Sequence, residues 1–385
     1  MSDYELRALT LPEVPAFLAH CAQTFAPAGA PAALFQDHWH NDPHAQVAGV
    51  LIALDPNTTT IVSSVRVYHR SLNLAHHLQI PCGAIGDVAT HPAHRGKGLA
   101  RRLMALADTY MKSCGIPVAA LHAAPLAAPL YEACGYVRRP MLMSVLRVAY
   151  PQDASTPAWL TWKGPAADLG YERLAALYDC FAPAGTLARD AAYWNMWVAR
   201  GSRDERAQLV RRAVRGKVDV DGRGRAFEGY AFLDVKSWRL CEWFAGWVAG
   251  DDDSPNNKDT TPAATITRLP ARLETEVFEY LLAACLHTAE PPIPPPPVDS
   301  TGDTFLEFKV PTALLPAMYN ESSSFQVKEA PRDDCWMFKS LAPCVAKPKS
   351  NSASSAATAT TTINTTQNLL AALGPDFGFC RTDAY

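Results

Sequence analysis

The feature that most constrains the fold is the stretch DVATHPAHRGKGLARRLM at residues 87–104. An apolar segment stops at a proline, and a basic turn leads at once into a helical pattern. A helix N-terminus leaves backbone N–H groups unpaired and carries partial positive charge. Gly96 and Gly98 remove the Cβ atoms that would block close approach, while Arg95 and Lys97 add cationic donors. This pattern is typical of a phosphate site, although a plain strand–helix connection with solvated cations shares it.

The segments around this turn alternate between strand and helix. Turn residues separate the segments, and helical spacing of apolar residues is expected over 98–112 and 125–134. Strand-like segments are expected over 47–54, 60–68, 83–89, 118–121 and 141–148. This order predicts an α/β or α+β domain over residues 1–149.

The chain also repeats itself. The pentapeptide FAPAG occurs at residues 25–29 and again at 181–185, and the tryptophans Trp39 and Trp194 follow the two copies at nearly equal distance. Later segments repeat the element order, with strands expected over 230–235 and 240–247 and a helix over 268–287. We therefore expect a second, degenerate unit over residues 157–290. Where the first unit has its basic turn, the second has the acidic AGDDDSPNNKD, so only the first unit is expected to bind an anion.

Two low-complexity segments divide the rest of the chain. EPPIPPPPV at residues 290–298 consists mostly of prolines, which supply no backbone donor, and it predicts a stiff linker. The Ser/Thr/Ala-rich tract at residues 347–367 has little to bury and predicts a disordered surface loop. Together these segments predict a small C-terminal domain over residues 299–385 with a disordered insert.

Composition excludes several classes of protein. A formal net charge of -3 does not fit a strongly basic nucleic-acid binder or a polybasic membrane-surface protein. No apolar run of about 18 residues predicts a membrane span, and the acidic start lacks the pattern of a signal peptide. Ten scattered cysteines without a CxxC pair are typical of reduced, buried thiols, so we expect a cytoplasmic protein.

Two motifs carry a resemblance to a known family. Arg95-x-x-Gly98-x-Ala100 matches the Arg/Gln-x-x-Gly-x-Gly/Ala signature of the GNAT N-acetyltransferases, and LYEACGY at residues 130–136 is similar to that family's LYxxxGF/Y segment. The resemblance implies acetyl-CoA as the cosubstrate. Its pantetheine arm would pair with backbone around Val88, Ala89 and Thr90, and its diphosphate would rest on the amides of Arg95, Gly96, Lys97, Gly98, Leu99 and Ala100.

The layout as a whole resembles the Eis (enhanced intracellular survival) acetyltransferases, in which a third domain is similar to a sterol carrier protein. This resemblance implies tandem GNAT folds, the first intact and the second degenerate, plus a small sterol-carrier-like α+β domain. It implies transfer to a primary amine, either on an aminoglycoside-like polyamine or on a lysine side chain, without a metal, and it suggests a homo-oligomer. The alternative is a non-catalytic acyl-CoA-binding or lipid-carrier protein, which the intact turn disfavours.

Acetyl transfer needs a base to deprotonate the amine and an acid to protonate the leaving thiolate. By its match to the family motif, Tyr131 is the expected acid; a packed tyrosine at a helix end is the alternative. Two carboxylates are candidates for the base. One is the terminal carboxylate of Tyr385, as in Eis-like enzymes, unless that segment is simply an ordered domain end. The other is Asp87, unless backbone amides hold it as an ordinary strand residue.

The histidine-rich run HWHNDPH at residues 38–44 has no partner cluster with ligand spacing, so we do not expect a metal site there. It falls where GNAT folds contact acceptor substrates. Trp39 and His40 are therefore candidates for lining a pocket for a cationic amine. A packed tryptophan among solvated histidines is the alternative. His91 and His94, beside the basic turn, either touch phosphate or are solvated.

Overall fold

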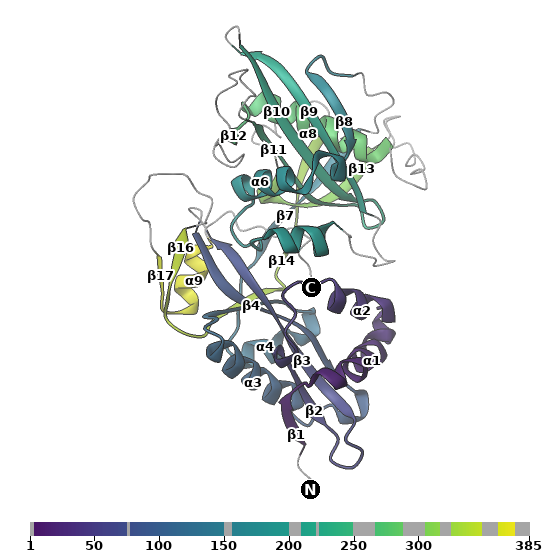
Figure 1. Ribbon diagram of the computed structural model, residues 1–385, viewed down its shortest axis with the longest axis vertical. Coiled ribbons are helices and arrows are strands. Elements are labelled where there is room, and N and C mark those ends of the chain that lie inside the picture. The colour runs from purple at the N-terminus through teal and green to yellow at the C-terminus, as the bar shows by residue number, and fades with distance from the viewer. Residues whose placement is uncertain are drawn as a thin grey trace.

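The computed structural model describes residues 4–74, 78–149, 156–199, 209–220, 223–248, 266–287, 305–315, 325–348 and 361–373. Within them the chain builds two mixed sheets, which lie in the lower and upper halves of Figure 1 with helices packed on them. Each sheet has its own buried core. We call the first sheet with its helices the first unit, and the other the second unit.

The first sheet has the order β1-β2-β3-β4-β5-β15-β6. Its strands are β1 (Glu5–Ala8), β2 (Val50–Leu54), β3 (Ile61–Leu74), β4 (Leu78–Thr90), β5 (Val118–His122), β15 (Trp336–Ser340) and β6 (Val137–Arg138). Its main helices are α1 (Val14–Phe25), α2 (Ala32–His40), α3 (Leu99–Ser113) and α4 (Ala128–Ala133).

Alternation along the strands explains why helices cover both faces of this sheet. On β2, Val50 and Ile52 pack with α1, whereas Leu51 and Ala53 pack with α3. All five β2 residues are buried, because each face of the strand meets a helix. Helix α3 contributes an apolar stripe at helical spacing, made of Leu99, Leu103, Met104, Ala107 and Met111.

The second sheet has the order β14-β7-β13-β11-β10-β9-β8, and β12 (Thr267–Arg268) pairs with β11. Its strands are β14 (Phe325–Asp333), β7 (Met141–Ala149), β13 (Phe305–Pro311), β11 (Arg239–Trp247), β10 (Arg223–Asp234), β9 (Leu209–Val220) and β8 (Leu160–Pro165). Its helices are α5 (Ala166–Leu169), α6 (Tyr171–Phe181), α7 (Ala191–Tyr193) with the π-helical η7 (Trp194–Val198), and α8 (Ala271–His287).

The two units exchange one strand each. The predicted strand at 141–148 forms as β7, but it lies in the second sheet, where Phe305 pairs with Ala149 and Phe325 pairs with Val148. In return, β15 enters the first sheet between β5 and β6, with Trp336 opposite His122 and Phe338 opposite both Ala120 and Val137. Each sheet therefore combines strands that lie far apart in the sequence.

The C-terminal residues differ from the separate domain expected over 299–385. Their described strands divide between the sheets, with β13 and β14 in the second and β15 in the first. The remaining elements, β16 (Cys344–Pro348), β17 (Thr361–Ile363) and α9 (Thr366–Ala372), pack against the long β3–β4 hairpin. Apolar strands of this length bury more surface by pairing with an open sheet edge than by building a small core of their own.

Parts of the predicted low-complexity segments fall outside the described residues. These are the proline linker at 290–298, the acidic segment at 249–259 and residues 349–360 of the Ser/Thr tract. The end of that tract, from residue 361, forms β17 and the start of α9. Among the described residues, every helix is too short or too polar to cross a membrane.

The two FAPAG copies occupy equivalent places. Phe25 is the last residue of α1 and Phe181 is the last residue of α6, so each copy begins where a helix of its unit ends. Gly29 and Gly185 both have positive φ, at 78° and 96°, which a glycine adopts at little steric cost. The repeat in the sequence therefore matches a repeat of local structure.

Candidate active site

The first unit has an open strand edge next to the basic turn. β4 and β5 pair in parallel only where Cys82–Ala84 face Val118–Ala120. Beyond Ala84, β4 runs on to Thr90 with β3 on one side and no described strand on the other. Backbone N–H and C=O groups on this edge are therefore available to an extended ligand that carries amides of its own.

A bulge sets the direction of this edge. Ser64 pairs with Ala89 and Arg66 pairs with Gly86, so Asp87 and Val88 together face one residue of β3. Asp87 has a φ of 48°, which is uncommon for a residue with a side chain and is often found where function requires it. The Ser64 hydroxyl donates to the Asp87 carbonyl at 2.9 Å, which holds the bulge from the neighbouring strand.

The basic turn follows directly. Gly96 and Gly98 have φ values of 75° and 72°, and a Cβ at either position would meet no atom within 4 Å. Both glycines are thus required by backbone conformation, and both face open space. Gly98 is the N-cap of α3 and supplies no side chain to the first N–H groups of that helix, which leaves them for an anion.

The cations of the turn have partners within the chain. Arg95 Nε donates to the Thr90 carbonyl at 3.1 Å, and Lys97 Nζ lies 2.7 Å from the Tyr4 hydroxyl. His94 Nδ1 is 2.9 Å from the same hydroxyl. Both Arg95 and Lys97 remain exposed, so they combine a fixed position with access to solvent.

Tyr131 lies on α4, in the core that the first sheet shares with α3. Its side chain is buried among apolar residues, with its ring edge-to-face against Tyr136 at 6.2 Å. Its hydroxyl has no hydrogen-bond partner among the residues that the structure describes. Burial raises the pKa of Tyr131 to about 12, so the hydroxyl stays protonated at neutral pH and is a proton donor.

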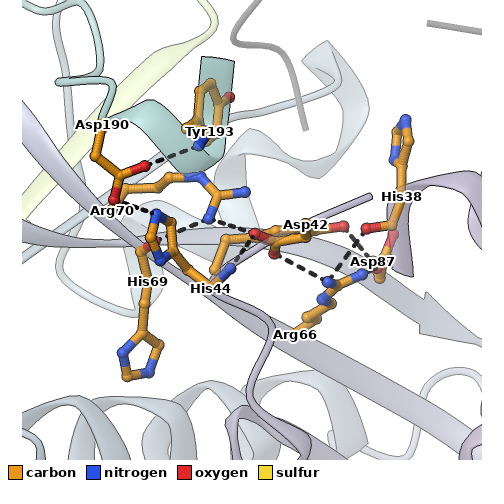
Figure 2. Close-up of polar contacts among 10 residues, drawn as sticks. His38, Asp42, His44, Arg66, His69, Arg70, Asp87, Asp190 and Tyr193 are labelled. Carbon is orange, nitrogen blue, oxygen red and sulfur yellow. Dashed lines mark hydrogen bonds and ion pairs between the residues drawn. The ribbon is translucent and has the colours of Figure 1, made fainter. Parts of the chain in front are cut away.

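Asp87 belongs to a buried polar network on the face of β3 and β4 that α1 and α2 cover (Figure 2). Its Oδ2 accepts a 2.9 Å hydrogen bond from the Tyr68 hydroxyl and lies 3.6 Å from Arg66 Nη1. Arg66 Nη2 then reaches Asp42 Oδ2 at 3.1 Å, and Arg70 Nη1 reaches Asp42 Oδ1 at 2.9 Å. Side chains rather than backbone amides therefore orient the Asp87 carboxylate.

The residues predicted to line an acceptor pocket take different roles. The Trp39 ring packs against Phe17 at 6.1 Å and lies under the Arg66 guanidinium, 4.9 Å from its centroid. The Arg66 guanidinium therefore occupies the ring face at which a cationic acceptor was expected. His40 is exposed, and its Nδ1 is 2.8 Å from the Gln36 carbonyl of the same helix. Of these two residues, Trp39 is the one joined to the network around Asp87.

Sequence reasoning did not single out the members of this network other than Asp87. Arg66, Tyr68 and Arg70 alternate along β3, so all three point to one face of an otherwise apolar strand. That period-two pattern of arginines within a buried strand was the available signal. Asp42 lies inside the histidine-rich run at residues 38–44, and its pairing with β3 is a tertiary contact that the local sequence does not indicate.

His20 on α1 is a further residue that the sequence did not identify. It is 5% exposed, and its Nε2 is buried without a hydrogen-bond partner among the described residues. Burial lowers the pKa of His20 to about 4, opposed by a weaker contact with the Ala89 backbone. The imidazole is therefore neutral at pH 7 and lies beside the free edge of β4.

The second unit lacks an equivalent opening in its described part. β11 and β13 pair in parallel at one position, Arg239 with Lys309. The space beside β11 is filled by Trp243, whose ring lies 4.7 Å from Phe278 and whose indole N–H donates to the Leu314 carbonyl. A buried indole occupies the region where the first unit offers free backbone.

Comparison with known proteins identifies the class of the first unit. A family model described as "Acetyltransferase (GNAT) domain" matches residues 5–138. A probable N-acyltransferase from Enterococcus faecalis has a similar structure, with a TM-score of 0.58 and 14% identity over 89% of this chain and 73% of the other. A GCN5-related N-acetyltransferase from Anabaena variabilis gives 0.55 and 12% over 94% and 82%. No curated protein sequence matches the chain.

The family match and the geometry of the site together define an N-acyltransferase. More specifically, residues 5–138 match the GNAT acetyltransferase domain, as the two motifs in this unit predicted. Eis1 from Mycobacterium abscessus is also similar, with 15% identity over 89% of this chain and 78% of that one, but at a TM-score of 0.49. The sterol-carrier-like domain expected from the Eis resemblance therefore stays a prediction that this likeness does not support.

Proposed function

We propose that the chain transfers an acetyl group from acetyl-CoA to a primary amine at one site in the first unit. The observation that carries the proposal is the free edge of β4, which leads into an exposed turn with two glycines at positive φ. The pantetheine amides would pair with the backbone of Val88, Ala89 and Thr90. The diphosphate would accept hydrogen bonds from the amides of residues 95–100 at the start of α3.

In the proposed reaction, the neutral amine attacks the thioester carbonyl, so a C–N bond forms as the C–S bond breaks. Tyr131 gives its proton to the departing thiolate, and its raised pKa keeps the hydroxyl protonated at neutral pH until that step. The surplus proton of the amine passes to a base. We propose Asp87 as this base, because it lies at the bulge of β4 directly before the backbone at which the thioester would lie, and its carboxylate is held in place by Tyr68.

The carboxylate of Tyr385 remains the second candidate for the base. It lies outside the described residues, and its assignment depends on the resemblance to Eis-like enzymes alone. The two candidates predict different behaviour on mutation. Removal of the last residues, Asp383 to Tyr385, abolishes turnover only if the terminal carboxylate takes the proton, whereas Asp87→Asn does so only if Asp87 does.

The proposal is tested by a screen of amine acceptors with acetyl-CoA, in which transfer is measured as release of the free thiol. Amines carried on polyamines and on lysine side chains belong in the screen, as do amines that also carry a carboxylate. Thiol release that depends on the amine supports transfer. Tight binding of CoA without turnover on any amine would instead support the non-catalytic acyl-CoA-binding alternative.

A further inference from the structure

Two buried arginines lie on the acceptor side of the site and share one carboxylate. The side chains of Arg66 and Arg70 are each 1% exposed, and that of Asp42 is 0% exposed. Both oxygens of Asp42 are used, Oδ2 by Arg66 and Oδ1 by Arg70 and the His44 amide. Asp87 Oδ2 also lies 3.6 Å from Arg66 Nη1, so two guanidiniums face two carboxylates in this group, as Figure 2 shows.

Arg70 uses only one of its three nitrogens. Its Nη1 donates to Asp42 and to the His69 carbonyl, at 2.9 and 2.8 Å. Its Nε and Nη2 are buried, and neither has a hydrogen-bond partner among the described residues. These two N–H groups point the same way from a guanidinium and together match the two oxygens of a carboxylate.

Among the described arginines, Arg70 is the only one with two buried nitrogens that lack a hydrogen-bond partner, and a third buried arginine shows the contrast. Arg189 in the second unit places Nη1 and Nη2 on the two oxygens of Glu242, at 3.1 and 2.6 Å. Both arginines lie over aromatic rings, so aromatic contact does not explain the difference. Arg189 thus places both terminal nitrogens on a carboxylate of the chain, whereas Arg70 so places only Nη1.

The surroundings of Arg70 come from both units. Its guanidinium carbon lies 5.3 Å from the ring centroid of Tyr68, 5.1 Å from that of Tyr193 and 5.8 Å from that of Trp197. Trp197 belongs to η7, a π-helical segment, and such segments are frequent at functional sites. His44 and Asp190, whose side chains meet at 3.0 Å and are partly exposed, form the outer rim.

We propose that Arg70 binds a carboxylate of the acceptor, so that the substrate is an amine which also carries an acid group. This inference rests on the proposed acetyl transfer. The guanidinium carbons of Arg66 and Arg70 lie 4.0 and 5.3 Å from the centroid of the Tyr68 ring between them, and Arg66 Nη1 is 3.6 Å from Asp87 Oδ2. The amine and the carboxylate are therefore several bonds apart, as in an ω-amino acid. A polyamine would bring a further cation toward two buried guanidiniums.

Three acceptors of equal length test this proposal: 6-aminohexanoate, 6-aminohexanamide and 1,6-diaminohexane. They share the reacting amine and differ only in the charge at the far end. The proposal predicts a kcat/KM at least tenfold higher for the acid than for the amide, mainly through KM, and the lowest value for the diamine. Equal values, or preference for the diamine, would overturn it while leaving acetyl transfer in place.

Variants at Arg70 test whether this residue causes the preference for the acid over the amide. In Arg70→Gln, the ratio of kcat/KM for the acid to kcat/KM for the amide falls to about one. In Arg70→Lys, which keeps the charge beside Asp42 but loses the paired donors, this ratio falls part of the way. Because each ratio comes from one preparation, it does not depend on how much of the variant is folded. Arg189→Lys, a buried arginine in the second unit, retains the wild-type ratio. A ratio unchanged in Arg70→Gln would contradict the proposal.

If none of the three probes is acetylated, calorimetric titration into the CoA-loaded protein replaces the rate measurement. The acid binding at least tenfold more tightly than the amide, with the difference lost in Arg70→Gln, supports the carboxylate site. Equal binding of acid and amide overturns it. Failure of the proposed acetyl transfer is recognised separately, because it appears as an absence of acetyl-CoA binding or of thiol release with every amine.

Discussion

The Asp87 carboxylate accepts a 2.9 Å hydrogen bond from the Tyr68 hydroxyl, and Asp87 makes this contact from a bulge at a φ of 48°. Burial keeps the pKa of Tyr68 well above its ordinary value, so that hydroxyl remains a donor at neutral pH. The bulge thus presents a carboxylate of fixed orientation next to an edge of free backbone. The strained conformation and the open edge occur at one point of β4.

Replacement of Asp87 by Asn tests its assignment as the base. We expect kcat to fall by about 10²–10⁴-fold, the usual contribution of a positioned acid or base, with little change in the Kd of acetyl-CoA. Ser64→Ala, which removes the hydroxyl that holds the Asp87 carbonyl, serves as the control for disturbance of the bulge. If Asp87→Asn turns over at the wild-type rate, the base lies elsewhere and the Tyr385 carboxylate becomes the leading candidate.

Tyr131→Phe tests the proposed acid with a nearly isosteric change. Turnover should drop by a similar factor while acetyl-CoA affinity stays the same, because the ring packing is retained. Tyr136→Phe is the matched control, since Tyr136 is also buried and contacts Tyr131 but is not expected to reach the thioester. A comparable loss in both variants would indicate a packing effect instead of proton transfer.

The pH dependence of stability should also report on Tyr131. Its folded pKa of about 12 lies above the ordinary value of 10, so its contribution is complete below pH 10 and is lost as pH rises toward 12. Two pKa units correspond to about 2.7 kcal/mol. Between pH 9 and pH 11.5, the free energy of unfolding in urea should therefore decline less in Tyr131→Phe than in the wild type. Equal declines in the two proteins would contradict the pKa shift.

His20 should produce the opposite dependence at acid pH. Its folded pKa of about 4 lies below the ordinary value of 6.5, so stability is complete above pH 6.5 and declines as pH falls toward 4. The shift corresponds to about 3 kcal/mol. His20→Gln should lose less stability than the wild type between pH 7 and pH 4.5, as measured by urea unfolding. Parallel losses in the two proteins would show that His20 takes up a proton without cost.

The strand exchange predicts that the first unit does not fold from its own residues alone. A fragment of residues 1–149 contains β5 and β6 but not β15, which pairs with both. It also exposes β7, whose partners β13 and β14 are missing. We expect this fragment to lack a cooperative thermal transition. A stably folded fragment that binds acetyl-CoA would contradict the exchange.

Local patterns in the sequence predicted most individual elements of the described chain. The helix expected over 98–112 is α3, and the strands expected over 118–121 and 240–247 are β5 and β11 within one or two residues. The partners of β7 and β15 were not predictable, because strand periodicity specifies which face is buried and not which strand lies alongside. The C-terminal residues were consequently assigned to a domain of their own.

The site divides in the same way. The backbone parts, at residues 88–90 and 95–100, follow from glycine positions and chain order, which are local properties. The network of Asp42, Arg66 and Arg70 depends on tertiary contacts between a loop after α2 and the middle of β3. Buried ion pairs leave a weak trace in a single sequence, since each charged residue alone is more often found on a surface.

The most direct test of the central claim is calorimetric titration of acetyl-CoA into the wild type, Gly98→Ala and Gly115→Ala. Both glycines have positive φ, at 72° and 69°, and both face open space, so each substitution costs a similar 1–2 kcal/mol or so of backbone strain. Only Gly98 lies in the turn. The account predicts one site per chain, weakened at least tenfold in Gly98→Ala and unchanged in Gly115→Ala. Absence of binding, two sites per chain, or equal affinity in the two variants would contradict it.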